Sequence, residues 1–455
     1  MNNNTAIKKT LLTEGPIWQR MTAFALPLFF GNLFQQLYNT ADSLIVGNFL
    51  GDSALAAVSS SGSLIFLLVG FFNGISMGAG VVIARYFGAN RKEELQRAIH
   101  TDVCFGLIAG ILLTVLGMIL TPKILVWMKT PSDVLPNSIL YFRTYFMGSL
   151  AFVMYNTFIG ILQSVGDSRH PLYYLIVSSI VNIILDLLFV GVFHMGVGAA
   201  ALATIISQFL SAGLCLYRLT RKSPDMYKVS LRKLCLDPFM LRQIISNGLP
   251  AGLQNSIISI ANVVVQSNIN SFGKMAMAGS GSYAKIEGFA FLPITCFSMS
   301  LTTFISQNLG AQKYDRAKKG ARFGITCCLI MAELIGIAIY IFAPVFIRAF
   351  NSDPSVIEFG VRHARTATLF YFLLAFSHCM AGILRGVGKA IIPMFVMLSC
   401  WCIIRVTYIT LILKVIPDIG MIYWAYPITW SLSSMVFLFF YLKTDWVHKF
   451  GKSTK

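Results

Sequence analysis

Long apolar runs, separated by short polar segments, make up most of this 455-residue chain. A run of about 20 apolar residues is long enough for one helix to cross a bilayer. Only helices or closed β-barrels can cross it, and these runs lack the alternation of barrel strands. The pattern predicts an all-α polytopic membrane protein with twelve transmembrane helices. The predicted spans are residues 18–43, 54–80, 98–120, 138–163, 171–193, 198–217, 242–268, 276–303, 321–343, 357–382, 391–413 and 421–442.

Composition and charge agree with this prediction. With 56% apolar and only 12% charged residues, the chain has too little polar surface for a soluble globular protein. A net charge of +18 would indicate a nucleic-acid partner in a soluble protein. Here, however, 26 of the 36 Lys and Arg lie in the two terminal segments and in every second loop. That distribution predicts that both termini are cytoplasmic and that the chain has no nucleic-acid partner.

The chain contains an internal repeat at an offset of 222 residues. The matching strings are IARYFGANRKEELQRA from Ile83 with ISQNLGAQKYDRAKKG from Ile305, and GILQSVGDSRHP from Gly160 with GILRGVGKAIIP from Gly382. The repeat predicts two lobes of six helices, residues 1–218 and 241–455, joined by a cytoplasmic linker at 219–240. Because six is even, both copies cross the membrane in the same sense, related by a pseudo-two-fold axis along the membrane normal. Such halves suit a secondary transporter with alternating access, although a repeat alone leaves a channel possible.

Two of the predicted spans carry polar stripes on otherwise apolar helices. The stripe of the first span contains Asn32, Gln35, Gln36, Asn39 and Asp42, and that of the seventh contains Asn255, Ser259, Asn262, Gln266 and Asn270. Polar side chains at membrane depth usually face protein or a water-filled cavity. We interpret the stripes as the two walls of a substrate cleft; the alternative is hydrogen bonding that holds neighbouring helices together.

Four acidic residues lie well inside predicted spans, namely Asp42, Asp186, Glu287 and Glu333. An ionised carboxylate there is costly, so it either carries a proton or pairs with a cation. Asn182 lies one turn before Asp186, which directs an amide and a carboxylate to one point. Such oxygens suit Na⁺ or reversible protonation, whereas the alternative is a structural hydrogen bond.

The remaining acids have competing interpretations. Asp42 could instead form a cap near the outer end of the first span. Glu287 is predicted either to line the cleft or to pair with Arg405. At the repeat offsets Asp42, Asn182 and Asp186 correspond to Val265, Ile404 and Tyr408. We therefore expect ion coupling to reside in the first lobe alone.

Three strings resemble the multidrug and toxic compound extrusion (MATE) family: ALPLFFGNLFQQLYNTADSLIVGNFLGDSALAA from Ala25, GILQSVGDSRHP from Gly160 and NIILDLLFVGVFHMGVGAAALAT from Asn182. The resemblance covers essentially the whole chain. It implies a two-lobed antiporter of twelve helices that exports cationic amphipathic compounds in exchange for H⁺ or Na⁺.

Family positions of the ion site match residues of this chain one by one. The acid on helix one matches Asp42, and the Asn and Asp on helix five match Asn182 and Asp186. Polar positions on helices four and six resemble Asn156 and Thr204. This pattern is similar to the DinF-like branch, whose cation site lies in the N-terminal lobe.

The predicted function is therefore multidrug efflux by antiport. The predicted protein is a monomer that binds small organic cations and lies in the lipid bilayer of a bacterial-type inner membrane. The chain has no phosphate-binding loop, nucleophile elbow or metal motif, so we expect no ATP hydrolysis, no enzymatic activity and no cofactor besides H⁺ or Na⁺. One alternative is a flippase for a lipid-linked or polysaccharide precursor, which should show a strongly basic cleft. A passive channel is the other, and it should lack titratable acids.

Overall fold

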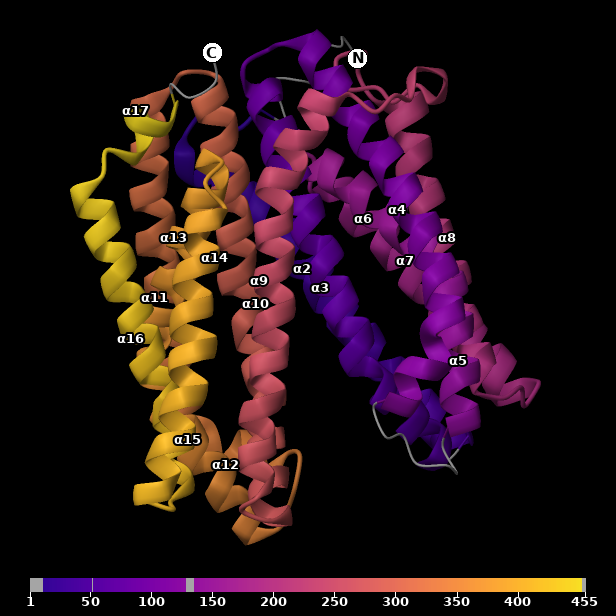
Figure 1. The fold of residues 1–455 in the computed structure, drawn as a ribbon, viewed down its shortest axis with the longest axis vertical. Coiled ribbons are helices and arrows are strands. Elements are labelled where there is room, and N and C mark those ends of the chain that lie inside the picture. Colours follow the sequence, from indigo (N-terminus) through magenta and orange to yellow (C-terminus); the bar gives the residue numbers. More distant parts are fainter. Residues whose placement is uncertain (1–10, 51, 128–134, 452–455) are drawn as a thin grey trace. The chain divides into compact units, whose positions relative to one another are not determined.

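The computed structural model describes residues 11–50, 52–127 and 135–451, except the side chains at 43, 44, 47, 52–69 and 449–451. Every regular element within these ranges is a helix (Figure 1). The first half contains α2 (Ile17–Leu50), α3 (Asp52–Gly88), α4 (Lys92–Trp127), α5 (Leu135–Met147), α6 (Ser149–Ser164), α7 (Arg169–Asp186), the π-helix η1 (Leu187–Val192), α8 (Val197–Tyr217) and the π-helix η2 (Arg218–Lys222).

The second half repeats this plan. It contains the short helix η3 (Leu231–Lys233), α9 (Pro238–Asn270), α10 (Lys274–Gly310), α11 (Tyr314–Arg348), α12 (Pro354–Ala367), η4 (Thr368–Phe370), α13 (Tyr371–Val387), α14 (Ile391–Met397), the π-helix η5 (Leu398–Ile404), α15 (Arg405–Val415), α16 (Ile419–Lys443) and α17 (Trp446–Gly451). The all-α class predicted from the apolar runs is confirmed.

Nine helical segments of the described residues are long and apolar enough to cross a membrane. The pair α5 and α6, which bends by 46° at Gly148, raises this number to ten if it forms one span. The first two predicted spans, 18–43 and 54–80, lie within α2 and α3, whose side chains are described only in part. A total of twelve spans stays a prediction.

The helices pack into two compact units. The first consists mainly of Leu26–Gly248, and the second of Leu12–Ala25 with Leu249–Lys455. Each unit therefore takes up a short piece of a helix that otherwise belongs to the other unit, and the divisions fall within α2 and α9. A proline follows each division closely, Pro27 in α2 and Pro250 in α9. The predicted boundaries of the lobes, 1–218 and 241–455, stay a prediction.

Residues 219–237, which the sequence analysis places in a linker, pack against α4 within the first unit. The Gln96 side chain donates to the carbonyl oxygens of Met226 at 3.0 Å and Lys228 at 3.2 Å. Tyr227 and Val229 are buried in the same apolar cluster as α4 residues. The segment is therefore a fixed part of the first unit.

The turns of the two units match at the repeat offset. Asn90 and Gln312 both have a φ of 57°, and Gly166 and Gly388 have φ values of 86° and 87°. Positive φ is unfavourable for residues with a Cβ atom, so its recurrence at equivalent positions marks a shared local structure. The internal repeat in the sequence thus corresponds to a repeat of backbone conformation.

Helix packing repeats as well. Ser76 on α3 donates to the carbonyl oxygen of Asn156 on α6 at 2.8 Å. Its counterpart Ser298 on α10 donates to the carbonyl oxygen of His378 on α13 at 2.7 Å. One serine hydroxyl in each unit thus joins the equivalent pair of helices, α3 with α6 and α10 with α13.

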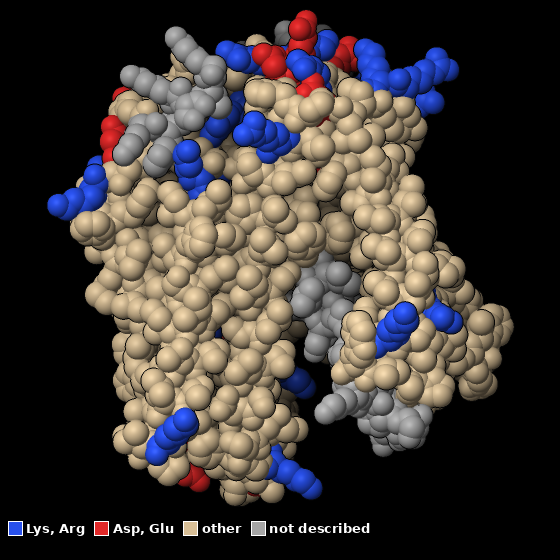
Figure 2. Space-filling model, viewed as in Figure 1, with Lys and Arg blue, Asp and Glu red and all other residues tan. Residues whose placement is uncertain are grey.

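Apolar side chains cover the outward faces of the helices. On α4, Ile111, Leu112 and Ile119 are more than half exposed, and so are Ile330 and Leu334 on α11. On the face drawn in Figure 2, most Lys, Arg, Asp and Glu side chains lie toward the helix ends, and the surface between is uncharged. Exposed apolar surface of this extent is stable against lipid and costly against water.

Helix contact in the second unit requires glycine at 382. A Cβ atom there would lie 2.6 Å from the carbonyl oxygen of Ser298, whereas a Cβ atom at Gly281 on α10 meets no atom within 4 Å. We expect Gly382→Ala to lower the free energy of unfolding by about 1–3 kcal/mol because α13 must move away from α10. Thermal unfolding in detergent measures the change. Gly281→Ala is the matched control and should be neutral or stabilising by up to about 1 kcal/mol; equal melting temperatures for both variants would contradict the packing.

Candidate functional site

Two acidic residues from different helices of the first unit meet at one place. Asp42 lies two turns before the end of α2, and Asp186 is the last residue of α7. Their carboxyl groups are close enough for direct electrostatic interaction. Asp186 and its neighbour Asn182 are fully buried, and Asp42 is half-buried. The structure thus brings together three residues that the sequence analysis assigned to one ion site.

Apart from the interaction between the two carboxyl groups themselves, these groups lack hydrogen-bond partners among the described residues. Both carboxylate oxygens of Asp186, both amide atoms of Asn182 and Oδ1 of Asp42 are buried without one. Most buried polar groups in proteins are hydrogen-bonded, and an orphaned one costs about 1–3 kcal/mol. The arrangement is therefore suited to a group that enters from outside, such as a proton or a small cation.

Two tyrosines belong to the same cluster, and the sequence analysis did not identify them. Tyr38 on α2 and Tyr141 on α5 both interact electrostatically with Asp42 and Asp186. Tyr38 lies one turn before Asp42, so helical spacing from the acid would have found it. Tyr141 comes from another helix, and no local pattern connects it to either acid.

The backbone changes its helical form directly after Asp186. Residues Leu187–Val192 form a π-helix, with Phe193 N–H donating to Leu188 C=O at 2.9 Å. Short π-helical segments occur frequently at functional sites because the wider turn redirects side chains and frees carbonyl groups. The sequence there is uniformly apolar apart from Gly191, so no sequence pattern predicted the π-helix.

The structure gives Asn156 and Thr204 local contacts. Asn156 Nδ2 donates to Phe152 C=O at 2.8 Å, and Thr204 Oγ1 donates to Ala200 C=O at 3.1 Å. Each bond stays within the residue's own helix. Among the described contacts, none ties Asn156 or Thr204 to Asp42 or Asp186, so their part in the ion site stays a prediction.

The polar stripe of α2 is accessible along its length. Asn32 and Gln35 are half-buried, while Gln36 and Asn39 are exposed. Gln35 interacts with Tyr38. The stripe therefore leads along one helix towards Asp42. It includes the neighbour of Tyr38, a side chain that also interacts electrostatically with Asp42 and Asp186.

The stripe of α9 forms hydrogen bonds mainly within its own helix. Ser259 Oγ donates to Asn255 C=O at 2.8 Å, and Gln266 Nε2 donates to Asn270 Oδ1 at the same distance. Asn262 is exposed. The hydrogen bonds of Ser259 and Gln266 thus stay within α9, and they do not support the alternative of interhelical hydrogen bonding for these two residues.

Glu287 lies in a separate, aromatic part of the second unit. Tyr283 O–H donates to its Oε1 at 3.3 Å and also contacts the hydroxyl of Tyr371 at 2.9 Å. Glu287 and Arg405 interact electrostatically, but no ion pair within 4.0 Å forms between them among the described residues. The guanidinium group of Arg405 instead donates to a hydroxyl and stacks on a ring.

The contacts of Arg405 define its role in the second unit. Its Nη2 donates to Thr429 Oγ1 at 3.0 Å, and its guanidinium lies 4.5 Å from the centre of the Tyr426 ring. Arg405 is only 3% exposed. Lys285, the other basic residue within a span, lies over the ring of Phe350. The two cations therefore do not form a joint basic site.

A further acid, Asp102 on α4, is almost fully buried, with Oδ2 lacking a partner among the described residues. The sequence analysis did not include it because it lies close to the start of its predicted span. The sequence did contain an indication of an unpaired acid, since no basic residue lies three or four positions from Asp102 on the same helix. Asp102 lies in a cavity apart from Asp42 and Asp186, described below.

Asp167 lies in the turn between α6 and α7, outside the spans, and forms an ion cluster. His170 Nδ1 lies 2.7 Å from Asp167 Oδ2, and Arg218 lies 3.6 Å from the same oxygen. Burial alone would raise the pKa of Asp167, but the hydrogen bonds of His170 and the charge of Arg218 outweigh it and hold the pKa below its usual range. This cluster ties the turn to the end of α8.

A family model and the related proteins found by comparison agree with one another. The MatE family model matches residues 27–188 and again 250–410, once in each repeat. The chain is 30% identical over 383 residues to the probable multidrug resistance protein YoeA of Bacillus subtilis, covering 83% of each. It is 27% identical over 392 residues to the probable multidrug resistance protein NorM of Thermotoga maritima, covering 85% of this chain and 83% of that one.

Solved structures show the same fold. A MOP superfamily transporter from Pyrococcus furiosus matches with a TM-score of 0.91 at 21% identity, covering all of both chains. An outward-facing multidrug resistance MATE family transporter of the MOP superfamily matches with a TM-score of 0.89 at 22% identity, covering 97% of this chain and 98% of that one.

The Asp167 cluster predicts a pH-dependent contribution to stability. Because folding lowers the pKa of Asp167, its contribution is complete well above the unfolded pKa of about 4 and is lost as the pH falls through the folded value. We expect Asp167→Asn to cost about 1–3 kcal/mol at pH 7 and progressively less below about pH 4. Thermal unfolding at several pH values measures this. The exposed acid Asp225, changed to Asn, should shift stability by less than about 0.5 kcal/mol; a pH-independent loss in Asp167→Asn would contradict the ionic origin.

Proposed function

This chain belongs to the MatE family of multidrug efflux transporters, and we propose that it exports organic cations in exchange for H⁺ or Na⁺ bound at Asp42, Asn182 and Asp186. The observation that carries the proposal is the meeting of Asp42 and Asp186 with orphaned buried oxygens. Two neighbouring carboxylates repel each other unless a proton or a cation lies with them. One bound ion therefore removes a large electrostatic cost.

The donor set fits either coupling ion. Carboxylate and amide oxygens are the ligands that hard cations prefer, and Asn182 supplies an amide beside the two acids. The same carboxyl groups can share a single proton. Asn156 and Thr204 are proposed as further oxygen ligands, which Na⁺ would need more than H⁺.

The link between ion and substrate runs along α2. Gln35 contacts Tyr38, and Tyr38 interacts with both Asp42 and Asp186. An ion bound at the acids cancels the negative charge that attracts an organic cation to the polar stripe beyond them. Ion and substrate then exclude each other, which is the requirement for exchange by alternating access.

The proposed substrate site consists of the polar stripes of α2 and α9 and one acid in the second unit. We propose that the organic cation contacts Asn32, Gln35, Gln36, Asn39, Asn255, Ser259, Asn262, Gln266 and Glu287. Relatives named for multidrug export support small organic substrates; one is the multidrug export protein MepA of Staphylococcus aureus, 22% identical over 377 residues.

Membrane orientation follows from the basic residues. The ends of the helices that carry most Lys and Arg face the cytoplasm in this proposal, together with both termini. The monomer is the proposed functional unit. We also propose the DinF-like branch, because the acids of the ion site are confined to the first repeat.

Export by a flippase mechanism receives less support from the contacts. A pyrophosphate-linked lipid requires several basic groups that point into one cavity. Arg405 is buried against Thr429 and Tyr426, and Lys285 lies over Phe350. The two cations are thus committed to different neighbours.

Transport in proteoliposomes tests the proposal. Purified full-length protein is reconstituted, and uptake of a fluorescent organic cation is followed under an imposed pH gradient and, separately, an imposed Na⁺ gradient. We expect Asp42→Asn and Asp186→Asn each to reduce gradient-driven transport by at least about tenfold, because one interaction of about 1.4 kcal/mol corresponds to that factor. The gradient that drives the wild type identifies the ion.

Glu333→Gln is the matched control for this experiment. Glu333 is also an acid at membrane depth, but it belongs to α11 of the second unit, whereas the proposed ion site consists of residues of the first. Its variant should transport within about twofold of the wild type. Accumulation against a gradient by well-expressed Asp42→Asn and Asp186→Asn proteins would overturn the assignment.

A further inference from the structure

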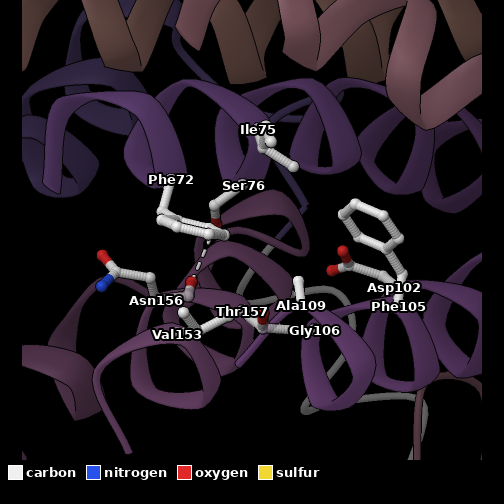
Figure 3. Close-up of a pocket in the computed structure, with 10 residues that line it drawn as sticks. All are labelled: Phe72, Ile75, Ser76, Asp102, Phe105, Gly106, Ala109, Val153, Asn156 and Thr157. Atoms are coloured by element: carbon white, nitrogen blue, oxygen red, sulfur yellow. Dashed lines mark hydrogen bonds between the residues drawn. The ribbon is translucent and has the colours of Figure 1, made fainter. Parts of the chain in front are cut away.

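A small cavity lies between α3, α4 and α6 of the first unit (Figure 3). Most of its lining is apolar, including Phe72 and Phe105, and its polar members are Ser76, Asp102, Asn156 and Thr157, of which Asp102 is the only acid. The space is sufficient for about one water molecule. The site is separate from Asp42 and Asp186, which do not line it.

Asp102 presents a carboxyl group to this cavity. In Figure 3 its oxygens point from α4 into the space beside Ala109. The residue is 3% exposed, and Oδ2 has no hydrogen-bond partner among the described residues. No Lys, Arg or His of the described chain forms an ion pair with it. A buried carboxylate with no cation is costly, so this group requires a proton or an ion.

The other polar groups of the cavity are largely committed to other contacts. Ser76 Oγ donates to Asn156 C=O, and Asn156 Nδ2 donates to Phe152 C=O. The amide of Asn156 points away from Asp102 in Figure 3. A cavity for about one water, with one carboxyl group, offers no shell of oxygens for a metal cation. A proton is the cation that this site can accommodate.

Among the described residues that line the cavity, no titratable side chain other than Asp102 is present. The helices α3 and α6 contribute apolar, hydroxyl and amide groups, and α5, which also packs on α4, contributes none of the lining. Along α4 itself, His100 points elsewhere, since its Nε2 accepts a hydrogen bond from Ser230 N–H at 3.0 Å. Proton exchange at Asp102 must therefore pass through water in the cavity.

The repeat shows that the fold does not require an acid at this position. The counterpart of Asp102 is Gly324, while the hydroxyl contact beside it, made by Ser76, recurs at Ser298. A Cβ atom on Gly324 would lie 2.6 Å from Leu301 Cδ2, so the second unit is filled where the first has a cavity. The carboxyl group of Asp102 is therefore not part of the structure that the two repeats share. It lies in the same unit as Asp42 and Asp186.

The depth of Asp102 differs from that of the two coupling acids. Asp102 lies ten residues after the start of α4, about 15 Å along the helix. Because successive helices run in opposite directions, the start of α4 and the ends of α2 and α7 lie at opposite ends of the unit. Thr101 Oγ1 accepts from Asp237 N–H at 3.2 Å, which places Asp102 just below the segment 219–237.

We propose that Asp102 is an inner proton-binding site of the first unit, which takes up a proton from cavity water and returns it to water beneath residues 219–237. The carboxylate gains one proton and becomes neutral. In this proposal, the water that delivers the proton enters the cavity from the side of residues 219–237. This inference extends the proposed ion exchange, because it adds a proton step at the opposite end of the unit from Asp42 and Asp186.

Infrared difference spectroscopy tests the proton itself, independently of transport. Full-length protein in lipid vesicles is titrated with acid, and the C=O band of a protonated carboxylic acid is recorded. We expect the isosteric variant Asp102→Asn to lose one component of this band, and the double variant Asp42→Asn with Asp186→Asn to retain it. A component that is unchanged in Asp102→Asn would overturn the proposal.

Transport supplies the second readout. In proteoliposomes, Asp102→Asn should slow pH-driven export of the fluorescent cation by about tenfold and flatten its dependence on pH at the inner side, while the Kd of the cation changes less than about twofold. Asp102→Glu should restore the infrared component and part of the rate. A wild-type pH profile in Asp102→Asn would overturn the proposal.

Ala109→Val provides a variant that keeps the acid but narrows the cavity. It should slow proton exchange at Asp102, seen as slower growth of the infrared component after a pH jump. If Asp102→Asn proves unstable, Ala109→Val and Asp102→Glu test whether Asp102 binds the proton. An unchanged growth rate of the infrared component in Ala109→Val would contradict proton exchange through cavity water. Transport driven by Na⁺ alone, with the Asp102 component intact, would exclude proton coupling at Asp42 and Asp186 while leaving the inner site established.

Discussion

The cost of placing a charge inside a membrane protein governs how this molecule is built. Backbone groups meet that cost by forming helices throughout, and most ionisable side chains avoid it by lying near helix ends. The few acids that remain buried need a partner. Asp42, Asp186 and Asp102 have no basic partner in the described contacts, and we propose that each takes a proton or a cation from solution. An antiporter uses this dependence, because a site that needs an ion can pass that ion from one side to the other.

The repeat separates what packing requires from what function adds. Turn conformations at Asn90 and Gln312, and the serine contacts of Ser76 and Ser298, recur in both units because helices of this length must turn and pack in the same way. The buried acids do not recur. Where the first unit has Asp102 and a cavity, the second has Gly324 in close contact with Leu301. Two copies of one architecture have therefore taken different electrostatic roles.

The second unit solves the problem of buried charge differently. Arg405 lies against Tyr426 and Thr429, where a ring face and a hydroxyl stabilise a guanidinium group. Glu287 receives a hydrogen bond from Tyr283. Each of these two charges has a hydrogen-bond partner on a neighbouring side chain of the protein. A charged side chain that is held by neighbouring groups is suited to lining a substrate path. An acid without a basic partner is suited to binding and releasing an ion.

The sequence alone determined the all-helical class, the internal repeat and the confinement of Asp42, Asn182 and Asp186 to one copy, because hydropathy and helical spacing are local properties of the chain. It also placed Asn182 and Asp186 on one face of a single helix. Tertiary structure alone decided that Asp42 meets Asp186, that Tyr141 joins them, and that Asn156 lies beside a different cavity with Asp102. The packing of residues 219–237 against Gln96 and the contacts of Arg405 were also visible only in the tertiary structure. Such contacts join residues distant in the chain, and no local pattern specifies which side chains meet.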